Sequence, residues 1–268
     1  MYFYEKLDKN HEVRGIYQDI VDCVYIITMK NNIERRQLFL KELEKVHLHS
    51  NIIIVNNGGY KEYEKYLFLK TKIKVENSIQ DITHANISIF EHAEKNNYDN
   101  ILILEDDFRF CVENIASTQS LHDLNNIISH EHSKVISLGC IPFISKKYDF
   151  NFLYNIYCIG AQAHIYKKNC REEINNFIQK NILYDWDGIT GTCGRVFYNK
   201  VLIYQIYQKD DWKKWGNSST NKINNFMNRN FIKIIGPIVC MVGSDLEKIK
   251  KHYKYQQIPS NYVKKILL

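Results

Sequence analysis

The stretch Asn100-Ile-Leu-Ile-Leu-Glu105-Asp106-Asp107-Phe108-Arg109-Phe110 runs four apolar residues directly into three consecutive carboxylates. Its apolar part is rich in β-forming residues and shows no alternation, which predicts a strand buried on both faces of a mostly parallel sheet. Open α/β sheets bind their ligands in the crevice at the carboxyl ends of such strands. The stretch therefore predicts both an α/β fold and the place of its functional site.

The three carboxylates carry the chemistry of this stretch. Adjacent acids repel one another, and a divalent cation such as Mg²⁺ or Mn²⁺ relieves the repulsion because it takes carboxylate oxygens as ligands. Successive strand residues point to opposite faces, so Glu105 and Asp107 point the same way and can hold one ion. Asp106 points the other way, toward a ribose hydroxyl or a backbone amide. The alternative is a solvated acidic turn after a core strand.

The order of the expected elements is that of an α/β protein. Before residue 110, β-forming runs alternate with segments of helical spacing, which implies a parallel sheet with helices on its faces. The expected strands are residues 23–29, 51–55, 72–76, 101–105, 135–139, 157–166 and 201–207. The first expected helix carries Arg35 and Arg36 in its first turn and runs through about residue 47. The other expected helices are residues 83–95, 112–133 and 168–180, and residues 1–20 are expected to be irregular. With 3 Pro and 11 Gly, the chain offers no flexible linker, so we expect one domain.

Two further segments carry polar groups that suit a substrate. Arg35 and Arg36 open the first expected helix, where guanidinium groups and the helix N-terminus both favour phosphate; a solvated basic turn is the alternative. The segment Tyr184-Asp185-Trp186-Asp187-Gly188 sets an aromatic residue between two acids in an expected active-site loop. Its Trp could face a sugar ring beside an acid that acts as a base. Alternatively, the Trp anchors an ordinary loop to the core.

The composition indicates a soluble globular protein. The net charge of +6 over 268 residues is spread along the chain, which favours an anionic ligand such as a nucleotide but not nucleic acid, whose binding needs a concentrated basic face. The seven Cys are scattered, which is typical of reduced thiols. The chain shows no signal sequence and no apolar run of membrane-spanning length. We therefore expect a cytoplasmic protein, or one in the host cytoplasm if its source is viral; heavy use of Asn, Ile, Lys and Tyr indicates a low-GC genome.

Four motifs, in order along the chain, resemble those of glycosyltransferase family 25, which includes lipooligosaccharide and procollagen galactosyltransferases. They are Val24-Tyr-Ile-Ile-Thr-Met29 with Glu34-Arg-Arg36, Thr83-His84 before a helix, the strand from Ile101 to Asp107, and Gly160-Ala-Gln-Ala-His-Ile-Tyr166 followed by Tyr184-Asp185. The resemblance covers roughly residues 22–220, and Thr83 stands where the family usually has Ser.

The resemblance implies a GT-A fold, which is a single Rossmann-like domain with a mostly parallel central sheet flanked by helices. It divides the chain into a donor-binding half at about 20–110, an acceptor half at about 111–220 and a C-terminal extension at 221–268. The implied activity is inverting transfer of a hexose, galactose or glucose, from a UDP-sugar with the help of Mn²⁺ or Mg²⁺. The implied acceptor is a hydroxyl of a glycan or of hydroxylysine in a collagen-like protein.

The residue roles that follow fall into three groups. Glu105 and Asp107 are the candidate metal ligands. The candidate contacts to the donor are Thr28, Arg35, Arg36, His84 and Asp106. Inversion needs a base on the far face of the sugar, and either Asp185 or Asp187 can supply it. A core histidine is the alternative interpretation of His84.

Two other functions fit part of the pattern. Phosphohydrolases and nucleotidyltransferases also use carboxylates with Mg²⁺, but usually show a nucleophilic Asp or a Gly-Ser phosphate motif near the first strand, and this sequence has neither. A non-catalytic glycan-binding protein of the same fold would show a degraded acidic triad, whereas Glu105-Asp106-Asp107 is whole.

Overall fold

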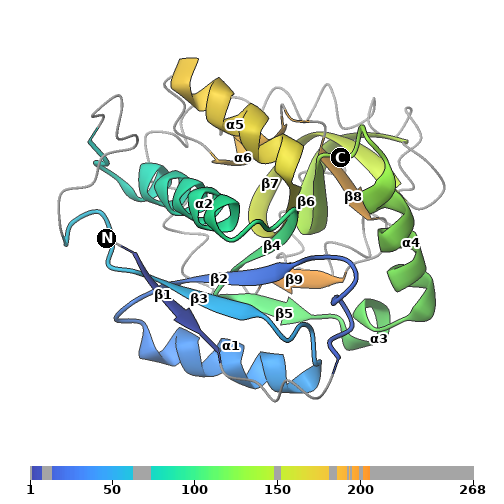
Figure 1. The fold of residues 1–268 in the computed structure, drawn as a ribbon, viewed down its shortest axis with the longest axis horizontal. Helices are drawn as coiled ribbons and strands as arrows, with labels where there is room; N and C mark the ends of the chain where they lie inside the picture. The colour runs from blue at the N-terminus through green and yellow to red at the C-terminus, as the bar shows by residue number, and fades with distance from the viewer. Residues whose placement is uncertain are drawn as a thin grey trace, which may run out of the picture.

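A computed structural model describes residues 2–7, 14–62, 74–147, 152–180, 186–191, 193, 195–198 and 202–205 of the chain (Figure 1). The strands are β1 (Phe3–Lys6), β2 (Cys23–Met29), β3 (Ile52–Asn57), β4 (Asn100–Glu105), β5 (Phe108–Phe110), β6 (Val135–Lys147), β7 (Phe152–Lys167), β8 (Arg195–Tyr198) and β9 (Ile203–Gln205). The helices are α1 (Ile33–Lys45), α2 (Ser78–Lys95), α3 (Val112–Ile115), α4 (Thr118–Ser129), α5 (Lys168–Lys180) and α6 (Trp186–Gly191). Among the helices of these ranges, none has the length and apolar character that a membrane span requires.

The central sheet is mixed rather than mostly parallel. Within the described residues it has seven strands in the order β1-β3-β2-β4-β7-β6-β8. β2 pairs in parallel with β3 and β4, as the β-α-β order predicts. However, β7 is antiparallel to both β4 and β6, and β1 is antiparallel to β3. The short link between β6 and β7, residues 148–151, explains the antiparallel pairing of these two strands, because parallel neighbours need a crossover of about a dozen residues or more.

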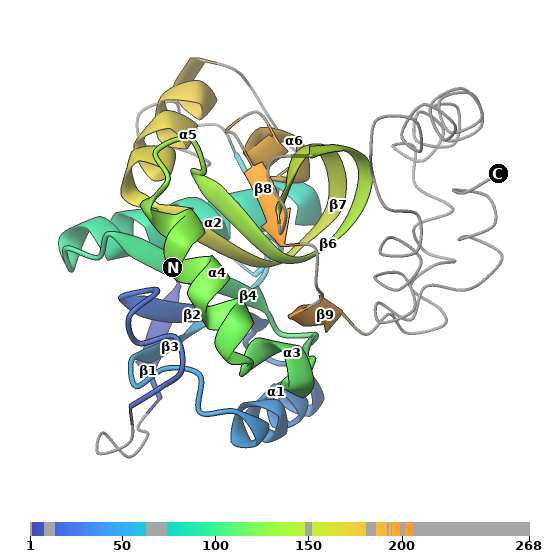
Figure 2. The same cartoon turned by 90° about the vertical axis from the view of Figure 1, so that its right-hand side faces the viewer.

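β4 lies between β2 and β7 and is buried on both faces, as its sequence predicts. Leu102 and Leu104 pack into a core that includes side chains of α1, α3 and α4. Ile101 and Ile103 pack into a second core with α2, α5 and α6. Figures 1 and 2 show these helices on opposite sides of the sheet, which we call the α1 face and the α2 face.

Most of the expected elements are present. β2 and α5 have the predicted bounds. The helix expected at 112–133 is instead two helices, because Ser117 caps the start of α4 by accepting a hydrogen bond from the Ser120 amide. Residues 3–6 form β1 where an irregular segment was expected. The expected strand at 72–76 and the extension at 221–268 lie partly and wholly outside the described residues.

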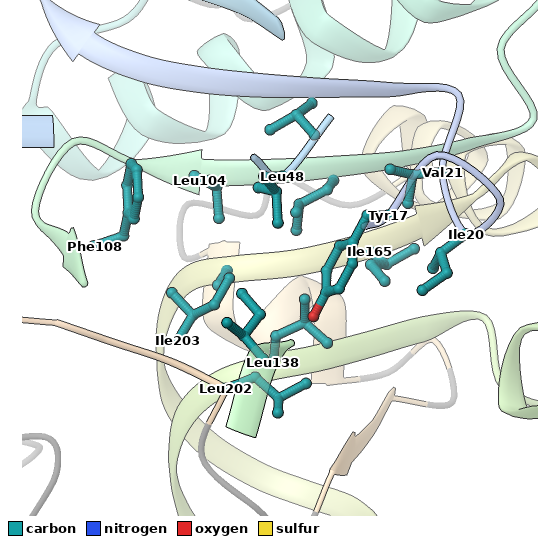
Figure 3. Close-up of a cluster of buried hydrophobic side chains, with 14 of the residues drawn as sticks. Tyr17, Ile20, Val21, Leu48, Leu104, Phe108, Leu138, Ile165, Leu202 and Ile203 are labelled. Carbon is teal, nitrogen blue, oxygen red and sulfur yellow. The ribbon is translucent and has the colours of Figure 1, made fainter. Parts of the chain in front are cut away.

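The core on the α1 face contains a buried hydroxyl. Tyr17 is fully buried, and Figure 3 shows it among apolar side chains that include Leu138 and Ile165. Its hydroxyl makes no hydrogen bond to any described residue, and burial raises its pKa. Tyr25 is buried as deeply on the α2 face, but its hydroxyl lies 2.8 Å from His92 Nδ1. The two tyrosines therefore form a matched pair that differs in hydrogen bonding.

We expect Tyr17→Phe to leave stability unchanged or to raise it, because an unsatisfied buried polar group costs about 1–3 kcal/mol. Tyr25→Phe is the control, and it should lower the free energy of unfolding by about 1 kcal/mol because it removes an existing hydrogen bond. Urea unfolding of both variants and the wild type measures the difference. An equal loss of stability in the two variants would contradict the expectation.

Candidate functional site

The three acids lie at the carboxyl end of β4, level with the end of its parallel neighbour β2. Glu105 is the last residue of β4 and pairs in register with Ile27, whereas Asp106 and Asp107 form the turn that leads into β5. Leu104 packs on the α1 face and Ile103 on the α2 face. The alternation of the strand therefore directs Glu105 toward the α2 face. Asp106 lies in the turn and contacts Thr28 and Arg35 of α1, on the α1 face. The sequence predicted opposite directions for Glu105 and Asp106. It predicted that Asp107 points the same way as Glu105, but in the structure Asp107 shares the Arg35 guanidinium with Asp106.

Asp106 is held by two side chains from neighbouring elements. Thr28, near the end of β2, donates a hydrogen bond of 2.8 Å from its hydroxyl to Oδ2. Arg35, in the first turn of α1, donates one of 2.8 Å from Nη1 to Oδ1. Asp106 is only 6% exposed. We expected it to meet a ribose hydroxyl or a backbone amide; in the structure, a protein hydroxyl and a guanidinium occupy its two oxygens.

Arg35 reaches the acids because α1 begins directly beside them. The side chain of Asn32 caps the helix by accepting a hydrogen bond of 3.1 Å from the Arg35 amide. The same guanidinium that contacts Asp106 also lies 3.5 Å from Oδ2 of Asp107. One nitrogen of Arg35 thus bridges two consecutive carboxylates.

Glu105 is a strongly perturbed acid. Burial raises its pKa well above the ordinary range, and the neighbouring carboxyl groups of Asp107, Asp187 and Asp106 raise it further. Arg35 acts in the opposite direction. Three other carboxyl groups and one guanidinium therefore act on Glu105, and we call the four carboxyl groups the acidic cluster.

Asp187 joins this cluster from α6, on the α2 face. It is partly buried, and its carboxyl group is one of those that raise the pKa of Glu105. The other candidate base, Asp185, lies outside the described residues. The segment expected to be a loop is helical from Trp186 onward.

Trp186 anchors α6 to the core instead of facing a substrate. It is 2% exposed, and its indole Nε1 donates a hydrogen bond of 2.9 Å to the Tyr166 hydroxyl. Its ring also packs against Phe90 of α2, with 5.6 Å between ring centroids. The expectation of a sugar-binding surface is therefore wrong for this residue, and the anchoring alternative is confirmed.

Two buried polar residues that were not singled out from the sequence, His164 and Arg195, lie close to the contacts of α6 with the core. His164 on β7 places Nδ1 3.0 Å from the Tyr166 hydroxyl, and burial, with a smaller effect of Arg195, lowers its pKa well below the ordinary value. Arg195 is fully buried and donates hydrogen bonds from Nη1 to the Thr190 hydroxyl at 2.7 Å and to the Asp187 carbonyl at 3.3 Å. An Arg at the start of the apolar run Arg195-Val-Phe-Tyr198 was the available signal, because a buried Arg needs partners.

The remaining candidates make other contacts. Arg36 pairs with Glu5 of β1 at 2.6 Å and donates to the Asn56 side chain at 3.3 Å, so it joins two strands at the sheet edge. His84 on α2 places Nδ1 2.6 Å from the Tyr2 hydroxyl. Of the two adjacent arginines, the structure brings Arg35 to the acidic cluster.

The cluster has the donor chemistry of a divalent-cation site but not a complete set of ligands. Its donors are all carboxylate oxygens, which suit Mg²⁺ or Mn²⁺. Within the described ranges, however, no three His, Cys, Asp or Glu side chains are arranged to hold a metal ion. Glu105 and Asp107 would therefore need further ligands or small side-chain movements to bind one.

Comparisons with known proteins leave the family of this chain open. No family model matches it, and no curated protein matches it. Among solved structures, it is similar to the crystal structure of A197 from STIV, with 12% sequence identity and a TM-score of 0.38 over 69% of this chain and 86% of that chain. A similarity this low identifies neither a fold family nor an activity. The structure itself defines an α/β protein with an acidic cluster at the carboxyl end of a central strand.

We expect stability to fall as the pH drops below about 6.5, in part through His164. The folded protein holds this side chain neutral, whereas an unfolded His binds a proton with a pKa of about 6.5. The stability it contributes is present above that pH and is lost as the pH falls toward the lower pKa of the folded state.

In His164→Gln, the free energy of unfolding should depend less steeply on pH, by up to about 1.4 kcal/mol per pH unit. Urea unfolding at several pH values between about 7 and 5 measures this slope, which is independent of the absolute stability of the variant. His132→Gln is the control, because His132 is exposed and its replacement should leave the slope unchanged. Parallel pH profiles for His164→Gln and the wild type would contradict the expectation.

Proposed function

We propose that this protein is a metal-dependent inverting glycosyltransferase that moves galactose or glucose from a UDP-sugar to a hydroxyl of a glycan or of hydroxylysine in a collagen-like chain. The observation that carries the proposal is the acidic cluster at the carboxyl end of β4, with Arg35 beside it. A nucleotide-sugar leaves behind a diphosphate, whose charge must be neutralised as the glycosidic bond breaks. Carboxylates for a cation and a guanidinium for phosphate are the groups that this chemistry requires.

Glu105 and Asp107 are the proposed ligands of Mn²⁺ or Mg²⁺, with Asp106 in support. The cation, when bound, would neutralise charge on the diphosphate leaving group. Arg35 is the proposed contact to the phosphates, and Thr28 keeps Asp106 in place through its hydrogen bond. Because burial and like charges disfavour the ionised form of Glu105, a cation would also relieve the repulsion within the cluster.

Inversion at the sugar requires a base that takes the proton of the acceptor hydroxyl. Asp187 and Asp185 are the two candidates. Asp187 lies at the start of α6 and raises the pKa of Glu105, and the buried contacts of Trp186 and Arg195 fix this helix to the core. A base held in this way contributes about 10²–10⁴-fold to the rate of a proton-transfer step.

The ordered resemblance to glycosyltransferase family 25 supports the same function. The residues that carry it include Thr28 and Arg35, which meet Asp106 although they are 78 and 71 residues away in sequence. His84 remains a proposed contact to the donor on the strength of the resemblance. The alternatives are a metal-dependent phosphohydrolase or nucleotidyltransferase and a non-catalytic glycan-binding protein.

We expect the purified protein to hydrolyse one UDP-hexose slowly in the presence of Mn²⁺ and without an acceptor, and EDTA to abolish the reaction. Asp107→Asn removes one proposed ligand charge at nearly constant size, so it should lower the rate by at least about 100-fold. Chromatographic detection of UDP and free hexose over a panel of UDP-sugars gives the rates and the donor.

The control is Asp99→Asn, which removes an exposed acid just before the opposite end of β4 and should leave the rate unchanged. Release of inorganic phosphate or UMP without free hexose would favour a phosphohydrolase. If UDP-sugars with Mn²⁺ neither bind nor react, while glycans alone stabilise the protein, a glycan-binding protein is indicated.

A further inference from the structure

Arg35 combines a fixed backbone with a side chain that reaches solvent. Its amide is held by the Asn32 cap, which fixes the first turn of α1. Its side chain is 33% exposed, whereas those of Asp106 and Asp107 are 7% and 13% exposed. The guanidinium therefore lies at the boundary between the carboxylates and the solvent. A change of side-chain rotamer can move it away from Asp107 without moving the helix.

The contacts of Arg35 lie where an incoming cation would bind. Its Nη1 is 2.8 Å from Oδ1 of Asp106 and 3.5 Å from Oδ2 of Asp107, and Asp107 is a proposed metal ligand. A guanidinium and a divalent cation compete for the same carboxylate oxygens and repel each other at short range. In the described part of the chain, Arg35 is the cationic group that acts on Glu105 within the cluster.

The two arginine contacts differ in strength, which sets the order in which they break. The contact with Asp106 is short and lies beside a second hydrogen bond from Thr28. The contact with Asp107 is longer and therefore weaker. Asp107 is thus the carboxylate that Arg35 can release at lower cost, while Thr28 continues to hold Asp106.

We propose that Arg35 is the resting counter-ion of the acidic cluster, and that it leaves Asp107 for the diphosphate of the nucleotide when the metal ion binds. This inference rests on the proposed function. The displaced guanidinium needs an anionic partner, and the phosphates beside the metal supply it. Without nucleotide, the metal must displace Arg35 from Asp107, and no phosphate replaces the lost contact. Metal and nucleotide therefore bind cooperatively, and each raises the affinity for the other by the same factor.

The test measures the affinity of the full-length protein for Mn²⁺ with and without UDP. The affinity is obtained from the electron paramagnetic resonance signal of free Mn²⁺, after subtraction of the Mn²⁺ that UDP binds in solution, and it does not depend on catalytic activity. In the wild type, UDP should tighten Mn²⁺ binding by about tenfold or more. In Arg35→Gln, Mn²⁺ alone should bind more tightly than in the wild type, UDP should bind more weakly, and the coupling factor should fall below its wild-type value, because only the direct attraction between Mn²⁺ and the diphosphate remains. Arg35→Lys, which keeps the charge but loses the planar fork, should give intermediate values.

Arg36→Gln is the matched control, because Arg36 is the next residue of the same helical turn but pairs with Glu5. It should preserve the wild-type affinities and coupling. If the wild type binds both ligands and the Arg35 variants show its affinities and coupling, the inference fails and the proposed function stands. Weaker binding of Mn²⁺ alone in Arg35→Gln would also overturn the inference. If the wild type binds neither Mn²⁺ nor UDP, the proposed function fails and the inference falls with it.

Discussion

The crowding of carboxyl groups at the end of β4 is the constraint on which this edge of the molecule depends. An apolar strand buried on both faces carries Glu105 to a place where burial and neighbouring acids both disfavour its charge. Thr28 and Arg35 offset part of this cost at Asp106. Because a slip of one residue between β2 and β4 would turn Thr28 to the opposite face, the register of the parallel pair and the arrangement of the cluster are specified together.

Two adjacent arginines of helix α1 make different contacts, and one of them neutralises part of the charge of these acids. Consecutive helix positions point about 100° apart, since a turn has 3.6 residues. Arg35 consequently faces the acids, while Arg36 reaches Glu5 and ties β1 to the sheet edge. The capping contact of Asn32 fixes the start of the helix for both. One turn of helix thereby connects the candidate site to the outermost strand of the sheet.

The parts of the fold that follow from local pattern were predictable, and the parts that depend on distant contacts were not. The bounds of β2 and α5 and the two-sided burial of β4 follow from runs of apolar residues and their spacing. The antiparallel position of β7 depends on its link to β6 and was missed. At the site, the sequence identified the acids and Arg35 as candidates. It did not decide whether Trp186 faces a substrate or packs in the core, because the same sequence pattern, an aromatic residue between two acids, is compatible with both.

The small β5–β9 sheet joins the acidic turn to a strand that is synthesised much later. β5 begins directly after Asp107, and its partner β9 lies at residues 203–205, with Phe108 opposite Gln205 and Phe110 opposite Ile203. During synthesis, β2, α1, β3 and β4 therefore emerge well before the strand that supports the acidic turn. Contacts between such distant segments form slowly, because a long loop must close first. Strands β1 to β4 can pair from the first half of the chain, but the acidic turn acquires its full support only after the ribosome has passed residue 205.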